Sequence, residues 1–441
     1  MKTFKIGGAH PPEMKEATKD LPLKPFTEIP YVAIPLSQHF GAPAICQVSK
    51  GDIVAKGQLI GKADGFMSAN VHASISGKVA RIENTITPQG KSCEQIIIEN
   101  DNKNQWAQGI PCDRDWHKLS ADEIIKIIAE AGIVGMGGAA FPAHIKLKPP
   151  KEKPIDTVVI NGVECEPYLT VDHRLMIEQP KTIVEGIQII LKTVGAKKAY
   201  IGIEANKPEA YEKIKAQASA ELQVEMLEIK YPQGAEKQLI EALTGRKVPP
   251  RKLPFDVGVV VQNVATAWAI TNAVKHCQPL IERTVTIAGD AIARPANFMV
   301  PIGTPIGLLL EYCGISPNTK KIILGGPMMG IAIADPFIPV VKGMSGILAF
   351  EKLPSFLSGP CIRCGKCIEV CPLSGMASEM ARAIEAGQIV DYDQLHVFDC
   401  MECGTCCFVC PAKRPLVQLV KQAKFEAAQK REQKRKSDHR P

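Results

Sequence analysis

Residues 361–372 have the sequence CIRCGKCIEVCP, and residues 400–411 have the sequence CMECGTCCFVCP. Both stretches follow the spacing C-x2-C-x2-C-x3-C-P, and cysteines this close on a tight loop can each bind one iron of a cubane. Soft thiolate ligands favour iron–sulfur clusters over hard metal ions. The two stretches therefore predict a ferredoxin-like module that holds two [4Fe–4S] clusters.

In two-cluster ferredoxins the fourth cysteine of each run binds the other cluster. This rule predicts two ligand sets, Cys361, Cys364, Cys367 with Cys410, and Cys400, Cys403, Cys406 with Cys371. Cys407 falls outside the spacing and is not predicted to be a ligand. A pair of structural zinc sites is the competing interpretation, but two complete runs that end in proline favour clusters. Residues 374–390 are predicted to form the helix between the runs.

The chain of 441 residues is 45% hydrophobic and too long for a single core, so several domains are expected. Nine of its fifteen cysteines lie in the cluster module. The other six are far apart and are expected to be separate buried thiols: Cys46, Cys93, Cys112, Cys165, Cys277 and Cys313. No apolar stretch reaches the ~18 residues of a membrane span, and no secretory segment follows Met1. A cytoplasmic protein is predicted.

The net charge of +7 resides at the C-terminal end. From Lys413 onward there are ten Lys/Arg and three Asp/Glu, so the preceding chain is balanced. A solvated helix end or a disordered arm is the simplest interpretation, and attraction to an anionic lipid surface or an acidic partner is the alternative. No aromatic residues alternate with this charge, so no nucleic-acid partner is predicted.

Residues 30–100 contain Gly-rich turns at roughly ten-residue spacing, which is typical of a small all-β sandwich. This segment resembles the barrel-sandwich of lipoyl and biotinyl carriers. Where those carriers present a modified lysine, this chain has Phe66 and Met67. The domain is therefore predicted to be structural.

Residues 120–290 alternate between strand and helix patterns, which predicts a parallel α/β sheet. Ser120 and Glu123 form a capping-box pattern at the start of a helix that ends at Gly132. Strands are expected over 155–160, 199–204, 224–229 and 257–262, and helices over 180–194, 207–220, 234–244 and 264–276. Ligands bind such sheets at the carboxyl ends of the strands. Residues 283–350 return to strand-like runs and predict a mostly β domain.

Two loops in the α/β region have the composition of a ligand site. Gly135, Gly137 and Gly138 do not form a Rossmann fingerprint, but they let backbone N–H groups approach a phosphate or a flat ring, with Lys146 nearby. NGVECEP (161–167) follows a predicted strand and brings a carboxamide and two carboxylates to its end. A packing turn and a solvated acidic turn are the alternatives.

Four segments occur in the order found in the FMN- and NADH-binding subunit of respiratory complex I. They are GMGGAAFPAHIK (135–146), NGVECEP (161–167), YPQGAEKQLIEALTGRKVPPRKLPF (231–255) and VQNVAT (261–266). Residues 1–412 are more similar still to the RnfC family, the C subunits of Rnf ferredoxin:NAD⁺ oxidoreductase complexes. GGAHPPEMKE (7–16), the barrel-sandwich, a β-grasp-like SLBB stretch and the double-cluster end carry that resemblance.

The resemblance implies a non-covalent FMN site with NAD(H) as the substrate. By motif position, the FMN phosphate and ring would be contacted by Gly135, Gly137, Gly138 and Lys146. The rest of the flavin site would be formed by Asn161, Glu164, Tyr231, Gly234 and Asn263. Phe141 and Phe255 offer stacking surface to NAD(H), while Glu166 (near the nicotinamide), Glu236 and Lys252 lie near its polar groups. No side chain is implied as acid or base. The chain departs from the complex I pattern at Met136, Val163 and Ala235, which replace an arginine, an aspartate and a glutamate.

The resemblance also implies a domain order: a barrel-sandwich over 1–110, the FMN/NADH domain over 115–280, the SLBB domain over 281–352, the cluster module over 353–415 and a basic tail over 416–441. It implies a subunit peripheral to the cytoplasmic side of the cell membrane, held by partner subunits that include a ferredoxin-like multi-cluster protein. Hydride would pass between NAD(H) and FMN, and electrons would pass singly through the clusters, coupled by partners to Na⁺ or H⁺ transport.

Two other functions share part of this pattern. A cytoplasmic flavo-iron–sulfur corrinoid reductase has similar flavin loops and clusters, but the N-terminal barrel-sandwich disfavours it. A scaffold without flavin, like the A subunit of the sodium-pumping quinone reductase, is disfavoured by the intact GMGGAAF and NGVECEP loops.

Overall fold

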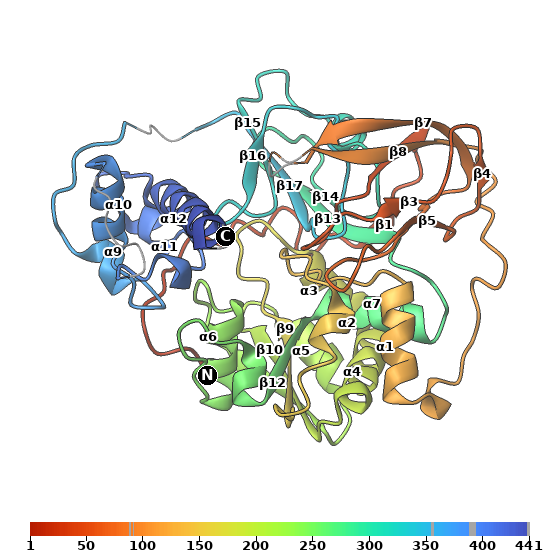
Figure 1. Cartoon of the computed structure of the whole chain (residues 1–441), viewed down its shortest axis with the longest axis horizontal. Coiled ribbons are helices and arrows are strands. Elements are labelled where there is room, and N and C mark those ends of the chain that lie inside the picture. The colour runs from red at the N-terminus through yellow and green to blue at the C-terminus, as the bar shows by residue number, and fades with distance from the viewer. Residues whose placement is uncertain (88–89, 91, 354–356, 388–393, 439–441) are drawn as a thin grey trace.

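The computed structural model describes residues 1–87, 90, 92–353, 357–387 and 394–438, with side chains as far as residue 431. Figure 1 shows the helical C-terminal module on one side, the α/β domain below and two β-rich domains above. This mixture of parts confirms the predicted fold class. Within these residues no helix has both the length and the apolar character that a membrane span requires.

The N-terminal domain is the predicted all-β sandwich. One sheet has the strand order β2-β8-β7-β4, and a second has the order β3-β5-β6. Val32, Ile34 and Ile98 are fully buried in the core. The strands are β2 (Tyr31–Pro35), β3 (Ile45–Cys46), β4 (Ile53–Val54), β5 (Leu59–Lys62), β6 (Val71–His72), β7 (Gly77–Ile86) and β8 (Ser92–Asn100).

The central domain contains the predicted parallel sheet, in the order β11-β10-β9-β12. Val158 and Ile160 pack in the core with α1, α4 and α7, whereas Val159 faces α6 on the other side. The strands are β9 (Thr157–Gly162), β10 (Lys198–Glu204), β11 (Leu222–Leu227) and β12 (Val259–Asn263). The helices are α1 (Ala121–Glu130), α2 (Ala143–Lys146), α3 (Val171–Glu178), α4 (Pro180–Val194), α5 (Pro208–Lys215), α6 (Glu236–Thr244) and α7 (Val264–Val274), with 3-10 turns at Trp116–Lys118 and Pro254–Val257.

The third domain is the predicted β-rich one, and it shares a hydrophobic core with the barrel-sandwich. Its sheet has the order β1-β14-β13-β17-β15-β16. Strand β1 (Leu23–Pro25) comes from the N-terminal segment and pairs in parallel with β14. The remaining elements are β13 (Glu282–Ala288), β14 (Ala296–Pro301), α8 (Ile306–Tyr312), β15 (Lys321–Leu324), β16 (Ile331–Ile333) and β17 (Gly346–Phe350).

The C-terminal module is a repeat of 39 residues. The first copy contains α9 (Lys366–Glu369) and α10 (Ala377–Glu385), and the second contains α11 (Thr405–Val409) and α12 (Leu416–Asp438). The helix predicted over 374–390 is therefore the shorter α10, and 388–390 lie outside the described residues. The predicted boundary at residue 415 cuts the module, because Val420, Ala423 and Ala427 of α12 pack in its core against Met380.

Two of the six isolated cysteines do not stay separate, and the expectation of six buried thiols was wrong for them. Cys112 and Cys277 form a disulfide across a sequence separation of 165 residues, with Cα atoms 5.4 Å apart. Backbone hydrogen bonds hold the two segments side by side, from Cys112 N–H to His276 O (3.0 Å) and from Arg114 N–H to Lys275 O (2.8 Å). Cys46 and Cys165 are only half-buried, while Cys93 and Cys313 are buried as expected.

Candidate functional site

The carboxyl ends of β9 and β12 form the point where the strand order reverses. β10 and β11 lie on one side of β9, and β12 lies on the other. In parallel α/β sheets ligands bind beyond the strand ends at such a reversal, and this edge, bordered by Asn161 and Asn263, is called the crevice below. Asn161 of β9 and Asn263 of β12 are register partners at this edge. The two predicted amides therefore lie where the topology favours a ligand.

The glycine-rich loop borders the same crevice. Gly135 N–H donates to Phe141 O at 2.8 Å and closes the loop. A Cβ built at Gly137 would lie 3.5 Å from the Asn263 Cβ, so this glycine contacts the end of β12. Gly138 has a φ of +109°, and nothing lies within 4 Å of a Cβ built there. The loop thus leaves exposed backbone in front of open space, which fits the close approach of a phosphate or flat ring.

The amide side chains also fix the surrounding loops. Asn161 Nδ2 donates to Gly234 O at 2.9 Å, and its Oδ1 accepts from Val163 N–H at 3.0 Å. A Cβ at Gly234 would come within 3.3 Å of the Asn161 amide atoms. Asn263 Oδ1 accepts from Ala265 N–H at 2.8 Å and so caps α7. The predicted residues Asn161, Gly234 and Asn263 are therefore brought together.

A buried carboxyl that the sequence interpretation missed lies behind the crevice. Asn263 Nδ2 donates to Asp172 Oδ2 at 2.7 Å, while Asp172 Oδ1 has no hydrogen-bond partner among the described residues. Burial, followed by the charge of Glu164, raises the pKa of Asp172 to about 6. Glu164 itself accepts from the backbone N–H groups of Asp172 (2.7 Å) and His173 (3.2 Å) and caps α3. An unpartnered buried oxygen beside the crevice is consistent with an additional ligand.

Lys146 and Glu236 form an ion pair on the rim. The distance from Lys146 Nζ to Glu236 Oε1 is 2.7 Å, and Lys146 also reaches Val261 O at 3.4 Å. The resemblance placed the lysine near the FMN phosphate and the glutamate near NAD(H). The structure joins them, so the ammonium is positioned beside the carboxyl end of β12.

Tyr231 and Glu166 connect the α/β domain to its neighbours. The Tyr231 hydroxyl donates to Cys403 O at 2.7 Å and lies 3.4 Å from Glu166 Oε1. Glu166 accepts from the backbone N–H groups of Met328 (3.0 Å) and Met329 (2.9 Å) in the β-rich domain. Burial raises the pKa of Glu166, and these two hydrogen bonds oppose that rise. Its carboxylate is thus already engaged by protein donors.

The predicted stacking residues lie in different surroundings. Phe141 stacks on Phe40 of the barrel-sandwich, with ring centroids 5.8 Å apart, and 60% of Phe40 is exposed. Phe255 lies under Lys153, whose Nζ is 4.8 Å from the ring centroid. Lys252 is exposed. Phe40 was missed because nothing in the sequence links the barrel-sandwich to this loop.

Two buried cationic side chains, which the sequence did not predict to be near this site, donate hydrogen bonds to the loops around the crevice. Lys15 donates to the carbonyls of Glu164 (2.9 Å), Glu166 (3.0 Å) and Leu169. Arg283 donates to the backbone oxygen of Met136 in the glycine loop, at 2.6 Å. Burial lowers the pKa of both side chains. The stretch GGAHPPEMKE near the N-terminus was the only signal in the sequence that pointed to Lys15.

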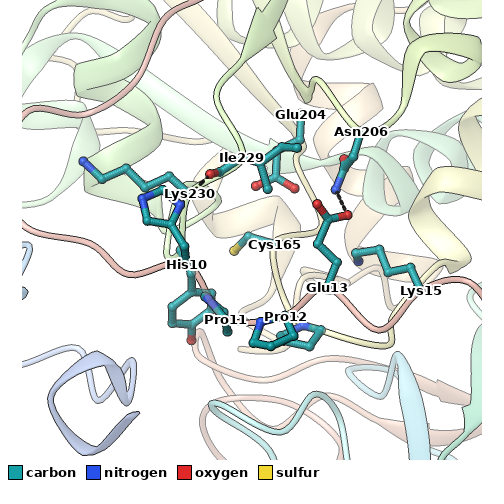
Figure 2. Close-up of a pocket in the computed structure, with 12 residues that line it drawn as sticks. His10, Pro11, Pro12, Glu13, Lys15, Cys165, Glu204, Asn206, Ile229 and Lys230 are labelled. Atoms are coloured by element: carbon teal, nitrogen blue, oxygen red, sulfur yellow. Dashed lines mark hydrogen bonds between the residues drawn. The ribbon is translucent and has the colours of Figure 1, made fainter. Parts of the chain in front are cut away.

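A separate cavity of about 370 Å³ lies beyond the ends of β10 and β11, under the N-terminal segment. Figure 2 shows Cys165 in its lining, with Glu13 bonded to Asn206 on one side and His10 on the other. The Asn206 Nδ2 to Glu13 Oε2 distance is 2.6 Å. Buried Glu204 pairs with Lys207 at 3.1 Å in the same region. The cavity walls are therefore held by internal pairs.

The two cysteine runs have the same backbone path. Left-handed φ values recur 39 residues apart, at Arg363 and Glu402, Gly365 and Gly404, and Ser374 and Lys413. The fourth cysteine of each run accepts an equivalent hydrogen bond, from Gly375 N–H to Cys371 Sγ (3.0 Å) and from Arg414 N–H to Cys410 Sγ (3.5 Å). Cluster sulfurs commonly accept such N–H bonds, so the donor sets fit iron–sulfur clusters.

The fourth cysteine of the first run lies within electrostatic reach of the second run. Burial is the main cause that raises the pKa of Cys400 and of Cys403, and Cys371 adds to it in both cases. Cys407 Sγ accepts from Val417 N–H at 3.2 Å, outside the shared pattern. Over the described part of the chain, no three His, Cys, Asp or Glu side chains are arranged to hold a metal ion. The fit of the two cysteine sets to iron–sulfur clusters therefore rests on the chemistry of the thiol ligands and on the repeated backbone path.

Comparison with known families adds three matches. They are the RnfC barrel sandwich hybrid domain over residues 2–103, the Nuo51 FMN-binding domain over residues 128–272 and the SLBB domain over residues 284–332. Met136 and Val163, two of the departures from the complex I pattern, are buried in the core. Both side chains therefore pack inside the protein instead of being exposed beside the glycine loop or Asn161.

Full-length relatives align with almost the whole chain. The C subunit of the proton-translocating ferredoxin:NAD(+) oxidoreductase complex of Clostridium ljungdahlii is 48% identical over 97% of this chain and 94% of its own. The C subunit of the Na(+)-translocating complex of Acetobacterium woodii is 45% identical, over 96% and 97%. The C subunit of the ion-translocating oxidoreductase complex of Rhodobacter capsulatus is 41% identical, over 98% and 85%.

Proposed function

Because this chain belongs to the RnfC family, the C subunits of ion-translocating ferredoxin:NAD(+) oxidoreductase complexes, we propose that it is the NAD(H)-reacting subunit of such a complex. The observation that carries this proposal is the convergence of two loops at the strand reversal. There the glycine loop, Asn161 and Asn263 meet, inside the segment matched by an FMN-binding domain. The N-terminal barrel-sandwich match disfavours a corrinoid reductase.

FMN would be held by residues around the strand reversal, where Asn161, Gly234 and Asn263 lie together. The backbone of Gly135, Gly137 and Gly138 would approach the phosphate or ring, with Lys146 to neutralise its charge. Asn161, Glu164, Tyr231, Gly234 and Asn263 would complete the pocket. FMN can exchange a hydride with NAD(H) and release its electrons singly, and a cubane carries one electron at a time.

NAD(H) would bind on the exposed side of the same crevice. Phe141 and Phe255 would offer ring surfaces, and Glu166, Glu236 and Lys252 would lie near the polar groups of the dinucleotide. The pairs Lys146–Glu236 and Glu166–Met328 already orient two of these carboxylates. No side chain has to act as a general acid or base, because the chain supplies position and electrostatics.

Two [4Fe–4S] clusters would be held by the cysteine sets predicted from the spacing, Cys361, Cys364, Cys367 with Cys410 and Cys400, Cys403, Cys406 with Cys371. The 39-residue repeat and the matched N–H···S bonds support this assignment. Partner subunits, among them a ferredoxin-like multi-cluster protein, would hold this chain at the cytoplasmic face of the membrane and couple it to ion transport. The relatives include both proton- and Na(+)-translocating complexes.

Anaerobic reconstitution of the whole chain tests the proposal. We expect one FMN, about eight iron and eight acid-labile sulfide per chain, and oxidation of NADH with an artificial acceptor. Serine at Cys371 should damage the cluster of the second run rather than the first. Zinc without sulfide would exclude the clusters, and a protein that binds no added FMN would be a scaffold.

A further inference from the structure

The two cysteine runs share one backbone path but differ in exposure. In the first run, residues 361–364 are all exposed, including Cys361 and Cys364. At the equivalent positions of the second run, Cys400 is half-buried and Cys403 is buried. Since the local structure is repeated, the difference comes from what covers the second run: α12 of the same module packs against Cys400, and other domains cover Cys403.

The α/β and β-rich domains cover the second run directly. The hydroxyl of Tyr231, which is itself buried, donates to Cys403 O at 2.7 Å. A Cβ at Gly404 would lie 2.8 Å from Met328 O, so the turn that binds Glu166 also closes over this loop. Tyr231 belongs to the proposed flavin set, and one hydrogen bond therefore joins that set to a cysteine of the second run.

The fourth ligand predicted for this set is held against the same domain. Gly8 N–H donates to Val370 O at 2.9 Å, and a Cβ at Gly7 would come within 2.7 Å of the Cys371 backbone. On the other flank, Gln238 Nε2 of α6 donates to Pro372 O at 3.2 Å. In Figure 1 the N-terminal segment runs between α6 and the C-terminal module. Cys371 and Cys403 thus both face the α/β domain.

We propose that Cys371, Cys400, Cys403 and Cys406 form the inner cluster site, next to the flavin, and that Tyr231 is the positioning residue between the two sites. The set of Cys361, Cys364, Cys367 and Cys410 is the outer site, where electrons are exchanged with another protein. This inference rests on the proposed function. For each hydride that FMN would accept from NADH, two electrons would pass singly to the inner site and on to the outer site, and the hydride's proton would be released from the flavin to solvent.

A matched pair of variants tests the order, because Cys364 and Cys403 occupy equivalent positions in the repeat. In Cys364→Ser the inner cluster should still be reduced by NADH at the wild-type rate. In Cys403→Ser the flavin should be bleached normally, but the remaining cluster should be reduced about tenfold more slowly or worse. Rapid mixing followed by absorbance of the flavin and by frozen-sample EPR of the clusters separates these steps.

Equal rates in the two variants, or the reverse order, would overturn the proposal. If NADH does not bleach the flavin even in the wild-type protein, the proposed function fails instead. Light-driven reduction of the flavin in the same samples then tests the cluster order by itself, and iron analysis confirms that each variant retains one cluster.

Tyr231→Phe provides a milder test that keeps the ring and both clusters. Loss of the hydroxyl removes a donor whose positive end points at the Cys403 carbonyl, which should lower the midpoint potential of one cluster only. The affected EPR signal should be the one that disappears in Cys403→Ser and persists in Cys364→Ser. A shift of the other signal, or of neither, would show that Tyr231 does not couple the sites.

Discussion

Gly138→Ala is the sharpest perturbation of the proposed flavin site, because it adds one methyl group to the exposed loop. Gly138 has a φ of +109° and open space around its Cβ position, so the substitution meets no clash within the protein. The unfavourable backbone angle costs about 1–3 kcal/mol. Gly245→Ala is the matched control, with a φ of +73° and equally open surroundings at the end of α6.

The two variants should differ in flavin binding. A methyl group at residue 138 occupies the space that a phosphate or ring needs in order to reach the backbone N–H groups. Each hydrogen bond lost to a charged group costs about 1.5–3 kcal/mol, which corresponds to a dissociation constant for FMN raised about tenfold to a hundredfold. At Gly245 the same methyl group should cost stability without changing FMN affinity.

Titration of FMN into anaerobically reconstituted protein, followed by quenching of flavin fluorescence, measures this difference. Iron and sulfide content should match wild type in both variants, which shows that the cluster module has formed. If Gly138→Ala binds FMN within about a factor of two of wild type, the glycine loop does not contact the flavin. The assignment of the crevice to FMN would then be wrong.

Three further outcomes are expected from other parts of the chain. Burial lowers the pKa of Lys342 from 10.5 to about 7. Between pH 7 and pH 10 the unfolded chain keeps a proton on this lysine that the folded chain has lost, so thermal stability should rise with pH over this range. Lys342→Met should flatten that rise. Cys112→Ser should lower stability by about 2–4 kcal/mol under oxidising conditions, and added reductant should abolish the difference from wild type. Phe40→Ala should remove one ring of the aromatic pair with Phe141. The KM for NADH should then rise about fivefold, which corresponds to roughly 1 kcal/mol of stacking, while kcat stays unchanged. The control Phe66→Ala, at an exposed residue, should alter neither constant.

Features set by neighbouring residues could be predicted from the sequence. The capping box of Ser120 and Glu123 is present at the start of α1, and α4 has the predicted bounds because Pro180 begins it and Gly195 ends it in a left-handed conformation. The strand and helix alternation was sufficient to predict a parallel sheet. It also predicted that the NGVECEP loop follows a strand end, where ligands bind such sheets.

Features set by distant segments could not be predicted. Helix α3 was missed because it has no side-chain cap of its own, and its first N–H groups are bound by Glu164 from the preceding loop. The backbone donors that bind the carboxylate of Glu166 lie 162 and 163 residues further along, and no local pattern indicated them. The Cys112–Cys277 pairing has the same origin, since no local pattern reveals a partner so far away.

The N-terminal segment explains why the flavin crevice and the cluster module are held in a fixed relation. Within residues 2–15 it pairs with Leu227 and Tyr231 at the ends of the sheet, donates to Val370 beside a cluster cysteine and inserts Lys15 among the carbonyls of the crevice loop. Each of these contacts consists of only one or a few hydrogen bonds. Together they join the loop after β9, the loop after β11 and the first cysteine run through one short stretch of chain. In the proposed electron transfer, fixed separations matter more than any single side chain. The segment would then contribute to function by position, without any of its residues touching a reacting atom.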